Sequence, residues 1–389
     1  MTKVLITGTF DIIHPGHLNL IKQAKELGDF IVAIIARDQN VIKVKGRESY
    51  FNEADRVENL KKLGLVDKVI LGDVVDPYKM IIQEKPDIIA LGYDQQAFVE
   101  GLIDLRANSK LHFDIKRLVS FKEDFCKGKN LRKAIDRAQL DEDDKTGFLL
   151  LDKESNWTSH DVVAKLRSIT KIKQIGHTGT LDPFATGLLI CAIGNATKMV
   201  GMFDLLPKTY EATIKLGIIS DTYDRTGQLK AQNLIELSSI KLKTDVNQLK
   251  EILSSFIGKQ LQIPPMYSAK KVGGKKLYDL ARQGKEIERK PNEIEIYKIE
   301  FLGLKDDIFN IKVKCSSGTY IRTLAYDLGQ KLGVGAVLWE LKRTAIGSFN
   351  LEQAIKLDQL TNNNFGQNLI IPLEALKVIN QGYLEGFLR

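Results

Sequence analysis

The stretch GHTGTLDPFATGLL, residues 176–189, is the motif that decides how the second part of the chain is interpreted. Two glycines precede Asp182 and Pro183 follows it, a composition typical of a loop whose backbone can approach a ligand closely. An aspartate in such a loop is usually a turn residue, and a catalytic carboxylate is the alternative. The loop alone leaves both interpretations open.

Several other stretches, in a fixed order, raise the weight of the catalytic interpretation. They are Leu150–Lys153, Lys208–Glu211, Pro265–Ala269, Gly274–Tyr278, Ala281–Gly284 and Cys315–Thr323. Together with the loop at 176–189, they resemble the TruB-type tRNA pseudouridine synthases, and the resemblance covers about residues 146–376. It implies an enzyme that isomerises uridine to pseudouridine at position 55, in the T loop of tRNA, without a cofactor.

The resemblance also implies a role for individual residues. Asp182 matches the catalytic nucleophile, and Arg322 matches the guanidinium that keeps this carboxylate ionised in a closed pocket. Tyr210 matches the residue that stacks on the uracil and assists proton transfer. His177 matches the residue that fills the position vacated when the target uridine is turned out of its loop.

A segment rich in basic and aromatic residues suits an RNA backbone and its unstacked bases, although a solvated surface has the same composition. The RNA contacts expected here and elsewhere are His177, Lys153, Tyr267, Lys270, Lys271, Lys275, Lys276 and Arg282. Of these, Lys153 and Tyr267 fit a scaffold role better than a chemical one. A non-catalytic RNA-binding or RNA-folding module is the rival class, but such a module has no use for a buried carboxylate facing RNA phosphates.

Bacterial members of this family usually carry a small RNA-binding domain after the catalytic domain. Here only 13 residues follow Leu376. We therefore expect that domain to be missing, with an effect on tRNA affinity rather than on the chemistry.

A second motif, GTFDIIHPGH at residues 8–17, follows a strand-like run and opens a helical pattern. His14 and His17 are three residues apart at a helix start, where the helix dipole favours phosphate. A zinc site is the alternative for this histidine spacing, but no further Cys or His residues lie nearby. No metal site formed by protein side chains is therefore expected.

The second motif resembles the nucleotidyltransferase superfamily with the HxGH signature. Stretches at 36–38, 43–47 and 86–95 are most similar to archaeal-type FAD synthases, which transfer AMP from ATP to FMN with Mg²⁺ on the triphosphate. The resemblance assigns His14 and His17 to catalysis. It implies nucleotide binding by Gly8, Thr9, Phe10, Asp11, His14, His17, Lys45, Gly92, Asp94 and Gln95.

The identity of the substrates of this first part stays open. Glycerol-3-phosphate cytidylyltransferase, using CTP, is the close rival to FAD synthase. Lys127-Gly128-Lys129 replaces the serine-rich turn that the superfamily often carries before its last helix, so an inactive domain is a further alternative.

The order of apolar runs predicts two domains. Residues 1–140 alternate strand and helix signals, which favours an α/β Rossmann-like doubly wound parallel sheet. Four adjacent acids at 141–144 predict a linker at residues 141–145. Residues 146–389 mix strands and helices irregularly, which is typical of an α+β domain with a mixed sheet.

Composition narrows the choices of binding partner and cellular compartment. The formal net charge is +8, and most of the basic excess lies after residue 145, a mild indication of a polyanionic partner. No window is apolar enough for a membrane span, and the first residues lack signal-peptide features. The three cysteines are odd in number and far apart, which suits a reducing cytoplasm. The sequence predicts nothing about oligomeric state.

Overall fold

A computed structural model describes most of the chain. The described residues are 1–95, 99–108, 111–120, 131–132, 135–136, 145–232, 246–268, 271–272, 275–277, 281 and 287–387. The chain divides into two compact units, Met1–Asp136 with Tyr383–Arg389, and Arg137–Gly382. The linker expected at 141–145 stays a prediction, because residues 137–144 lie outside the described ranges.

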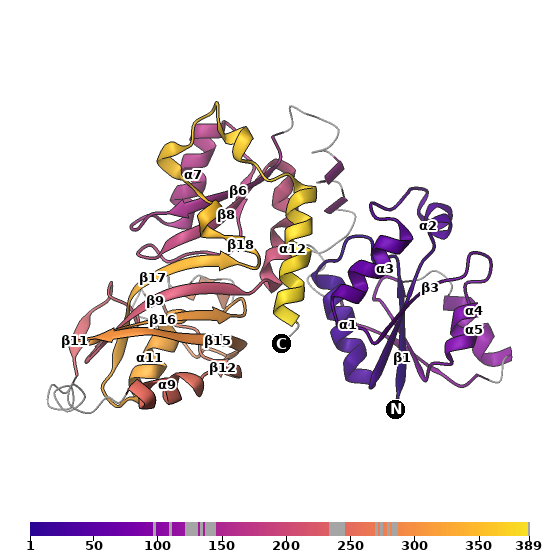
Figure 1. Ribbon diagram of the computed structural model, residues 1–389, viewed down its shortest axis with the longest axis horizontal. Helices are drawn as coiled ribbons and strands as arrows, with labels where there is room; N and C mark the ends of the chain where they lie inside the picture. The colour runs from indigo at the N-terminus through magenta and orange to yellow at the C-terminus, as the bar shows by residue number, and fades with distance from the viewer. Residues whose placement is uncertain are drawn as a thin grey trace. The chain divides into compact units, whose positions relative to one another are not determined.

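The first unit is built on a five-stranded parallel sheet in the order β3-β2-β1-β4-β5 (Figure 1). Its strands are β1 Lys3–Gly8, β2 Phe30–Ile35, β3 Lys68–Leu71, β4 Ile88–Leu91 and β5 Asp114–Arg117. Its helices are α1 Pro15–Leu27, α2 Asp38–Lys45, α3 Glu53–Lys62, α4 Lys79–Glu84 and α5 Val99–Asn108. This order confirms the predicted doubly wound sheet.

The strand order reverses between β1 and β4, and ligands of such sheets bind outside the strand ends at that point. The motif at 8–17 follows β1, and Gly92–Gln95 follows β4. The two stretches predicted to bind nucleotide therefore leave neighbouring strands at the same edge. Near the end of this unit, residues 131–132 and 135–136 are described, and they are helical.

The second unit contains a ten-stranded mixed sheet, which confirms the predicted class. Its main path runs β12-β15-β16-β9-β17-β8-β6-β19, while β18 pairs with β17 and β7 pairs with β8. The strands are β6 Gly147–Lys153, β7 Ile175–His177, β8 Thr186–Ile193, β9 Lys208–Leu216, β12 Gly258–Gln262, β15 Asn292–Lys305, β16 Ile308–Cys315, β17 Ala336–Ile346, β18 Phe349–Asn350 and β19 Ile355–Lys356. Two short pairs lie apart from this sheet: β10 Ile218–Ser220 with β11 Leu229–Ala231, and β13 Lys271–Val272 with β14 Lys275–Lys276.

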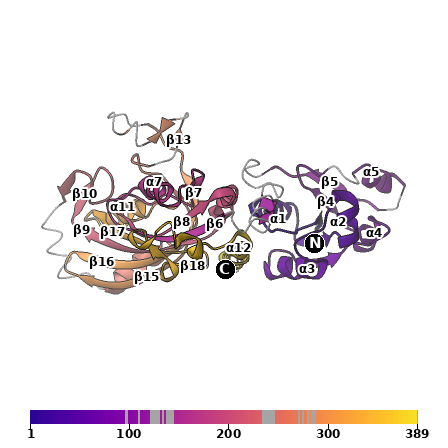
Figure 2. The same ribbon diagram turned by 90° about the horizontal axis from the view of Figure 1, so that it is seen from above.

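The helices of the second unit cover the sheet and close its ends. They are α7 Ser159–Thr170, α9 Val246–Ser254, α11 Ile321–Lys331 and α12 Pro372–Phe387, with 3-10 helices at Gly194–Leu205, Leu351–Gln353, Leu357–Gln359 and Phe365–Asn368. α9 and α11 lie against one side of the sheet (Figure 1), and α7 lies beside β7 (Figure 2). A capping box begins α7, since the side chains of Thr158 and Asp161 each accept a hydrogen bond from the other residue's backbone N–H.

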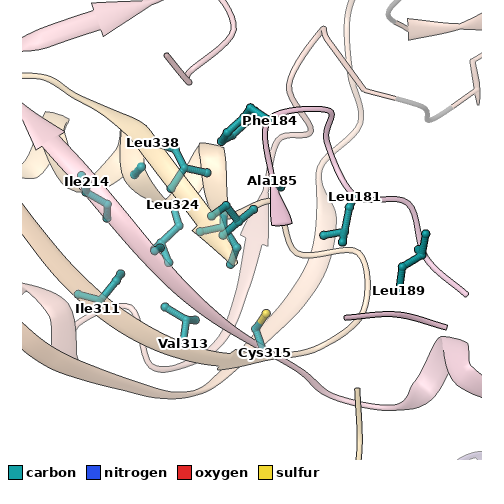
Figure 3. Close-up of a cluster of buried hydrophobic side chains, with 14 of the residues drawn as sticks. Leu181, Phe184, Ala185, Leu189, Ile214, Ile311, Val313, Cys315, Leu324 and Leu338 are labelled. Carbon is teal, nitrogen blue, oxygen red and sulfur yellow. The ribbon is translucent and has the colours of Figure 1, made fainter. Parts of the chain in front are cut away.

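One buried cluster connects the loop after β7, the long strands and α11. Leu181, Phe184, Leu324 and Leu338 all belong to it, and Figure 3 shows them with their neighbours. Burial of apolar side chains from both sides of Asp182 fixes the loop in place. The buried cluster thus holds Asp182 in position.

Candidate active sites

Asp182 lies in the loop between β7 and β8, on a backbone held from both directions. The Leu181 N–H donates to the Ser159 hydroxyl at 2.9 Å, and the Ala185 N–H donates to the Asp182 carbonyl at 3.0 Å. The Asp182 side chain is 32% exposed, so one side of the carboxylate faces solvent while the rest is enclosed. A substrate can therefore reach this carboxylate from outside.

Arg322, on the first turn of α11, supplies the positive charge beside Asp182. Its Nη2 donates to Oδ1 at 3.0 Å, and its Nε lies 2.9 Å from Oδ2 with the N–H out of line for a hydrogen bond. Nη2 also donates to the Tyr267 carbonyl at 2.8 Å. The pairing that the resemblance implied is thus made by the fold, across 140 residues of sequence.

A second carboxylate, Asp224, shares the same guanidinium. Nη1 of Arg322 lies 3.3 Å from Asp224 Oδ2, and the Asp224 side chain is only 4% exposed. Its Oδ1 accepts hydrogen bonds from the Thr226 N–H at 2.8 Å and from the Thr222 hydroxyl at 2.8 Å. Asp224 therefore locks Arg322 in place while competing with Asp182 for its charge.

The pKa of the Asp182 carboxyl is raised, chiefly because burial disfavours its charged form. Arg322 and Lys153 oppose this by lowering the pKa, whereas the negative charge of Asp224 raises it further. Removing positive charge from this site would thus favour a protonated, unreactive carboxyl.

Tyr210 reaches the same site from β9. It pairs across the sheet with Arg343 of β17. Burial is the main cause of the raised pKa of the Tyr210 hydroxyl, so it stays protonated, although the positive charge of Arg343 acts to lower this pKa. Arg343 is itself 1% exposed and donates to the carbonyls of Leu188 at 2.8 Å and Gly179 at 3.1 Å. It thereby connects Tyr210 to the loop that carries Asp182.

Lys153 corrects one sequence prediction. It is 1% exposed, and its Nζ donates to the carbonyls of Trp157 at 2.6 Å, Glu154 at 2.9 Å and Pro183 at 3.2 Å. Burial lowers its pKa to about 8, while Asp182 raises it. An ammonium enclosed by three carbonyls is not available to RNA, so its role is to hold the residue after Asp182.

The other predicted RNA contacts are only partly described. His177 ends β7 and is half-buried, and burial is the main cause of its lowered pKa, so its ring is neutral at physiological pH. Lys271, Lys275 and Lys276 lie on the small β13–β14 pair. Lys270 and Arg282 lie outside the described residues.

In the first unit, His14 and His17 stack at the start of α1, with ring centroids 3.8 Å apart and planes inclined by 21°. Burial lowers the pKa of His14 to about 4 and that of His17 well below its usual range. Both Nδ1 atoms are buried without a hydrogen-bond partner among the described atoms. The two histidines are thus neutral, and their Nδ1 atoms can still form hydrogen bonds with a ligand.

The loop between β1 and α1 is held by a buried arginine from α3. Arg56 is fully buried and donates to the carbonyls of Thr9 at 2.6 Å and Ala36 at 2.8 Å. Lys45 donates to the Thr9 hydroxyl at 2.7 Å. Asp11 accepts the N–H groups of residues 50 and 51 at 2.9 and 3.0 Å, so this carboxylate shapes the loop.

Positive charge collects around this loop. Burial lowers the pKa of Lys45, and Arg47, Arg56 and Arg132 lower it further, against one opposing carboxylate, Asp11. Arg132 lies 3.4 Å from Asp11 and stacks over the Tyr50 ring at 4.2 Å. Excess cations beside a helix N-terminus suit a polyanion such as a triphosphate.

The turn after β4 forms the other wall of this edge. The Gln95 side chain donates to the Thr7 hydroxyl at 2.7 Å and accepts the Gly92 N–H at 3.1 Å, which ties β4 to β1. Arg117 donates to the Gly92 and Gln95 carbonyls at 3.0 and 2.9 Å. Asp94 is exposed at the tip of the turn.

Three further observations apply to the described part of the chain. Within the described ranges, no three His, Cys, Asp or Glu side chains converge to hold a metal ion. Every helix of the described part of the chain is too short or too polar to cross a bilayer. Cys191 and Cys315 are free and buried.

Comparison with known proteins decides the family. Residues 167–321 match the model for the TruB family pseudouridylate synthase N-terminal domain, and residues 322–376 match that for the tRNA pseudouridylate synthase B C-terminal domain. The tRNA pseudouridine synthase B of Clostridium novyi (strain NT) is 44% identical over 238 residues, which cover 61% of this chain and 80% of the relative. That of Clostridium acetobutylicum is 47% identical over 224 residues, 58% of this chain and 75% of the relative.

The chain belongs to the TruB family of pseudouridylate synthases.

Residues 5–139 of this TruB-family chain match the cytidylyltransferase-like family model. Among solved structures, a Cbf5-Nop10-Gar1 complex covers 64% of each chain at 26% identity, with a TM-score of 0.47. A lipopolysaccharide core biosynthesis protein from Thermoplasma volcanium matches 31% of this chain and 99% of its own at 37% identity, with a TM-score of 0.30.

Sequence reasoning missed three residues of this TruB-family protein that the fold brings to the sites. Asp224 reads as a turn residue in Asp-Thr-Tyr-Asp-Arg, Arg343 as a surface charge in a strand, and Arg117 as a strand end. Each acts through contacts with residues distant in sequence, and no local pattern signals such contacts. The one weak signal available is at Arg343, where the residues two positions away on the same strand face, Leu341 and Ala345, are apolar.

Proposed function

We propose that the second unit converts uridine 55 of tRNA to pseudouridine, using Asp182 as the nucleophile or stabilising carboxylate. The observation that carries this proposal is the half-open Asp182 carboxylate, paired with the buried guanidinium of Arg322. A buried ion pair is costly to keep and adds little to folding, so its presence at an open loop favours a catalytic role.

The reaction needs three things that the described residues can supply. The bond between ribose C1′ and uracil N1 breaks while the Asp182 carboxylate attacks or stabilises the sugar. The detached uracil must stay in the pocket and turn, and the ring of Tyr210 offers a face for it. Its C5 then bonds to C1′ and loses a proton, so no electron is exchanged and no cofactor is required.

Tritium release from tRNA transcripts containing [5-³H]uridine tests this function, because the new bond forms at C5. Release should depend on a uridine at position 55, and a transcript with cytidine there should release none. Asp358→Asn, an exposed aspartate of the same unit, is the matched control for Asp182→Asn. No release from the wild-type protein with any tRNA would contradict the proposal.

We also propose that the first unit transfers a nucleotidyl group, with AMP from ATP to FMN as the specific reaction. The stacked His14 and His17, whose buried Nδ1 atoms are unpartnered among the described atoms, carry this proposal together with the surrounding cations. In-line transfer between phosphates needs positioning and charge neutralisation rather than a covalent enzyme intermediate. Mg²⁺ would arrive on the triphosphate, which fits a site lacking three converging metal-ligand side chains among the described residues.

Chromatography of FAD formed from FMN and ATP tests the second activity. His17→Ala should slow transfer by about 10²- to 10³-fold with FMN binding kept. His112→Ala is the control, an exposed histidine of the same unit. Product from CTP and glycerol 3-phosphate instead would identify a cytidylyltransferase, and no product from either pair would indicate a domain without transfer activity.

A further inference from the structure

Three consecutive residues of the loop between β10 and β11 each contact a residue outside the loop. Tyr223 stacks on Tyr326 of α11, Asp224 pairs with Arg322, and Arg225 lies over the Phe184 ring at 5.8 Å. Phe184 is two residues beyond Asp182, so the loop contacts both elements that carry the catalytic pair. Asp224 fixes Arg322, whereas Tyr223 and Arg225 have no assigned role.

The stack itself is close and regular. The ring centroids of Tyr223 and Tyr326 are 4.2 Å apart, with planes inclined by 22°. Tyr326 follows Arg322 by four residues on α11, so the two side chains lie on one face of the helix, a turn apart. The stack and the Asp224–Arg322 contact are therefore neighbouring attachments between the same loop and the same helix.

The backbone of Tyr223 is strained, so contacts of the surrounding loop must hold it in place. Tyr223 has φ +63°, a left-handed conformation that an aromatic residue rarely adopts. The Leu338 N–H donates to the Tyr223 carbonyl at 3.0 Å, and the Arg225 N–H donates to the Leu338 carbonyl at 3.1 Å. These bonds fix the loop to β17.

We propose that Tyr223 and Tyr326 are positioning residues of the pseudouridylate-synthase site, whose stacked rings clamp the loop onto α11 and set where Asp224 meets Arg322. The inference rests on the proposed function of the second unit. Without the clamp, the loop would relax toward an unstrained backbone and draw Asp224 away from the guanidinium. Arg322 would then lose the contact that fixes its fork relative to Asp182, and a small misplacement of this kind slows chemistry more than it weakens substrate binding.

Two variants remove the stack from opposite sides. Tyr326→Leu keeps an apolar helix residue without the ring. Tyr223→Asn removes the other ring while keeping a residue that tolerates the left-handed conformation, so it folds without added strain. Tyr326→Phe keeps the ring, and Tyr297→Leu, at a half-buried tyrosine of β15, measures the general cost of losing one.

The experiment is single-turnover tritium release from tRNA, with tRNA affinity measured separately by filter binding. We expect Tyr326→Leu and Tyr223→Asn each to lower the rate about tenfold with affinity within about twofold, and Tyr326→Phe to match the wild type. In an Asp224→Asn background, Tyr326→Leu should cost little more, because the clamp acts through that carboxylate.

Three results would overturn the inference. One is a wild-type rate for both ring-removing variants, the second is an unchanged tenfold loss in the Asp224→Asn background, and the third is a loss confined to tRNA affinity. The third would make the rings a contact for an RNA base instead. An inactive wild-type protein would instead contradict the proposed function, so the two failures are distinguishable.

Discussion

At the scale of single residues, the second unit depends on how one guanidinium divides between Asp182 and Asp224. Nη2 and Nε of Arg322 face the first carboxylate, and Nη1 faces the second. A planar guanidinium presents separate N–H groups to the two anions in a fixed geometry, which a rotating ammonium does not provide. Backbone strain is found beside both proposed sites. The two aromatic residues with positive φ among those described are Phe10, beside the first site, and Tyr223, beside the second.

Asp182→Asn should lower pseudouridine formation by about 10⁴-fold or more with tRNA affinity kept. The folded-state pKa of Asp182 is raised, so its ionisation costs stability as pH rises through that pKa. The variant should therefore unfold at the same or a higher temperature at about pH 8, and the difference should vanish in acid. Tritium release, filter binding and calorimetry at two pH values measure the three quantities, and near-normal turnover would exclude Asp182 as the nucleophile.

The rate should also fall in acid, because only ionised Asp182 reacts. Burial raises the pKa of Asp182, so the acid limb of the single-turnover rate should lie above the ordinary aspartate value of about 4. Arg322→Lys should move this limb to higher pH, since it weakens the main contribution that lowers the pKa, and should reduce the plateau rate by about 10²-fold. A pH profile identical to that of the wild type would mean that Arg322 does not govern the charge of Asp182.

At the scale of elements, local sequence patterns indicate regular helices and strands but do not indicate β17, a central strand of the mixed sheet. The apolar run at β2 and the capping box of α7 specify their structures through neighbouring residues, so both can be seen in the sequence alone. Strand β17 was not predicted, because an irregularity near Trp339 breaks its alternation and a buried arginine occupies its core side. The Asp182–Arg322 pair was predicted only through family resemblance, since a loop sequence carries no information about distant partners.

The approach of β8 to β17 gives a prediction at this scale. Gly187 has φ +96°, and a Cβ added there would lie 2.3 Å from the Arg343 carbonyl oxygen. Gly187→Ala should destabilise the second unit by about 3 kcal/mol or more, since backbone strain and a steric clash add. Gly318→Ala is the control, with φ +84° and nothing within 4 Å, and should cost only the backbone term. Thermal unfolding compares them, and equal losses would mean that β8 and β17 can separate freely.

At the scale of the whole molecule, the cytidylyltransferase-like model and the two TruB models match separate parts of one chain. The described contacts divide it after Asp136, close to the linker predicted from four adjacent acids at 141–144. Each candidate site is assembled within its own unit, from elements of one sheet and the helices against it. The helix α12 begins in the second unit, and its last residues, from Tyr383, group with the first.

Residues 1–140 and 145–389, produced separately, should each fold and keep their own activity. Few interactions are expected to cross a linker that contains four adjacent acids. Circular dichroism with the tritium-release and FAD-formation assays on each piece measures this. If either piece is inactive while the intact chain works, the units depend on each other.

The 140-residue separation of Asp182 from Arg322 has a consequence for the growing polypeptide. A nascent chain that has left the ribosome as far as β16 holds Asp182 and Asp224 but not the guanidinium that both require. At that stage Asp224 lacks its ion-pair partner and Asp182 has only the more distant charge of Lys153, so this part of the protein is less stable until α11 emerges. β17, the strand that joins β8 to β9, emerges later still. Turnover therefore begins only after nearly the whole unit has been synthesised, which makes catalysis a sensitive reporter of completed folding.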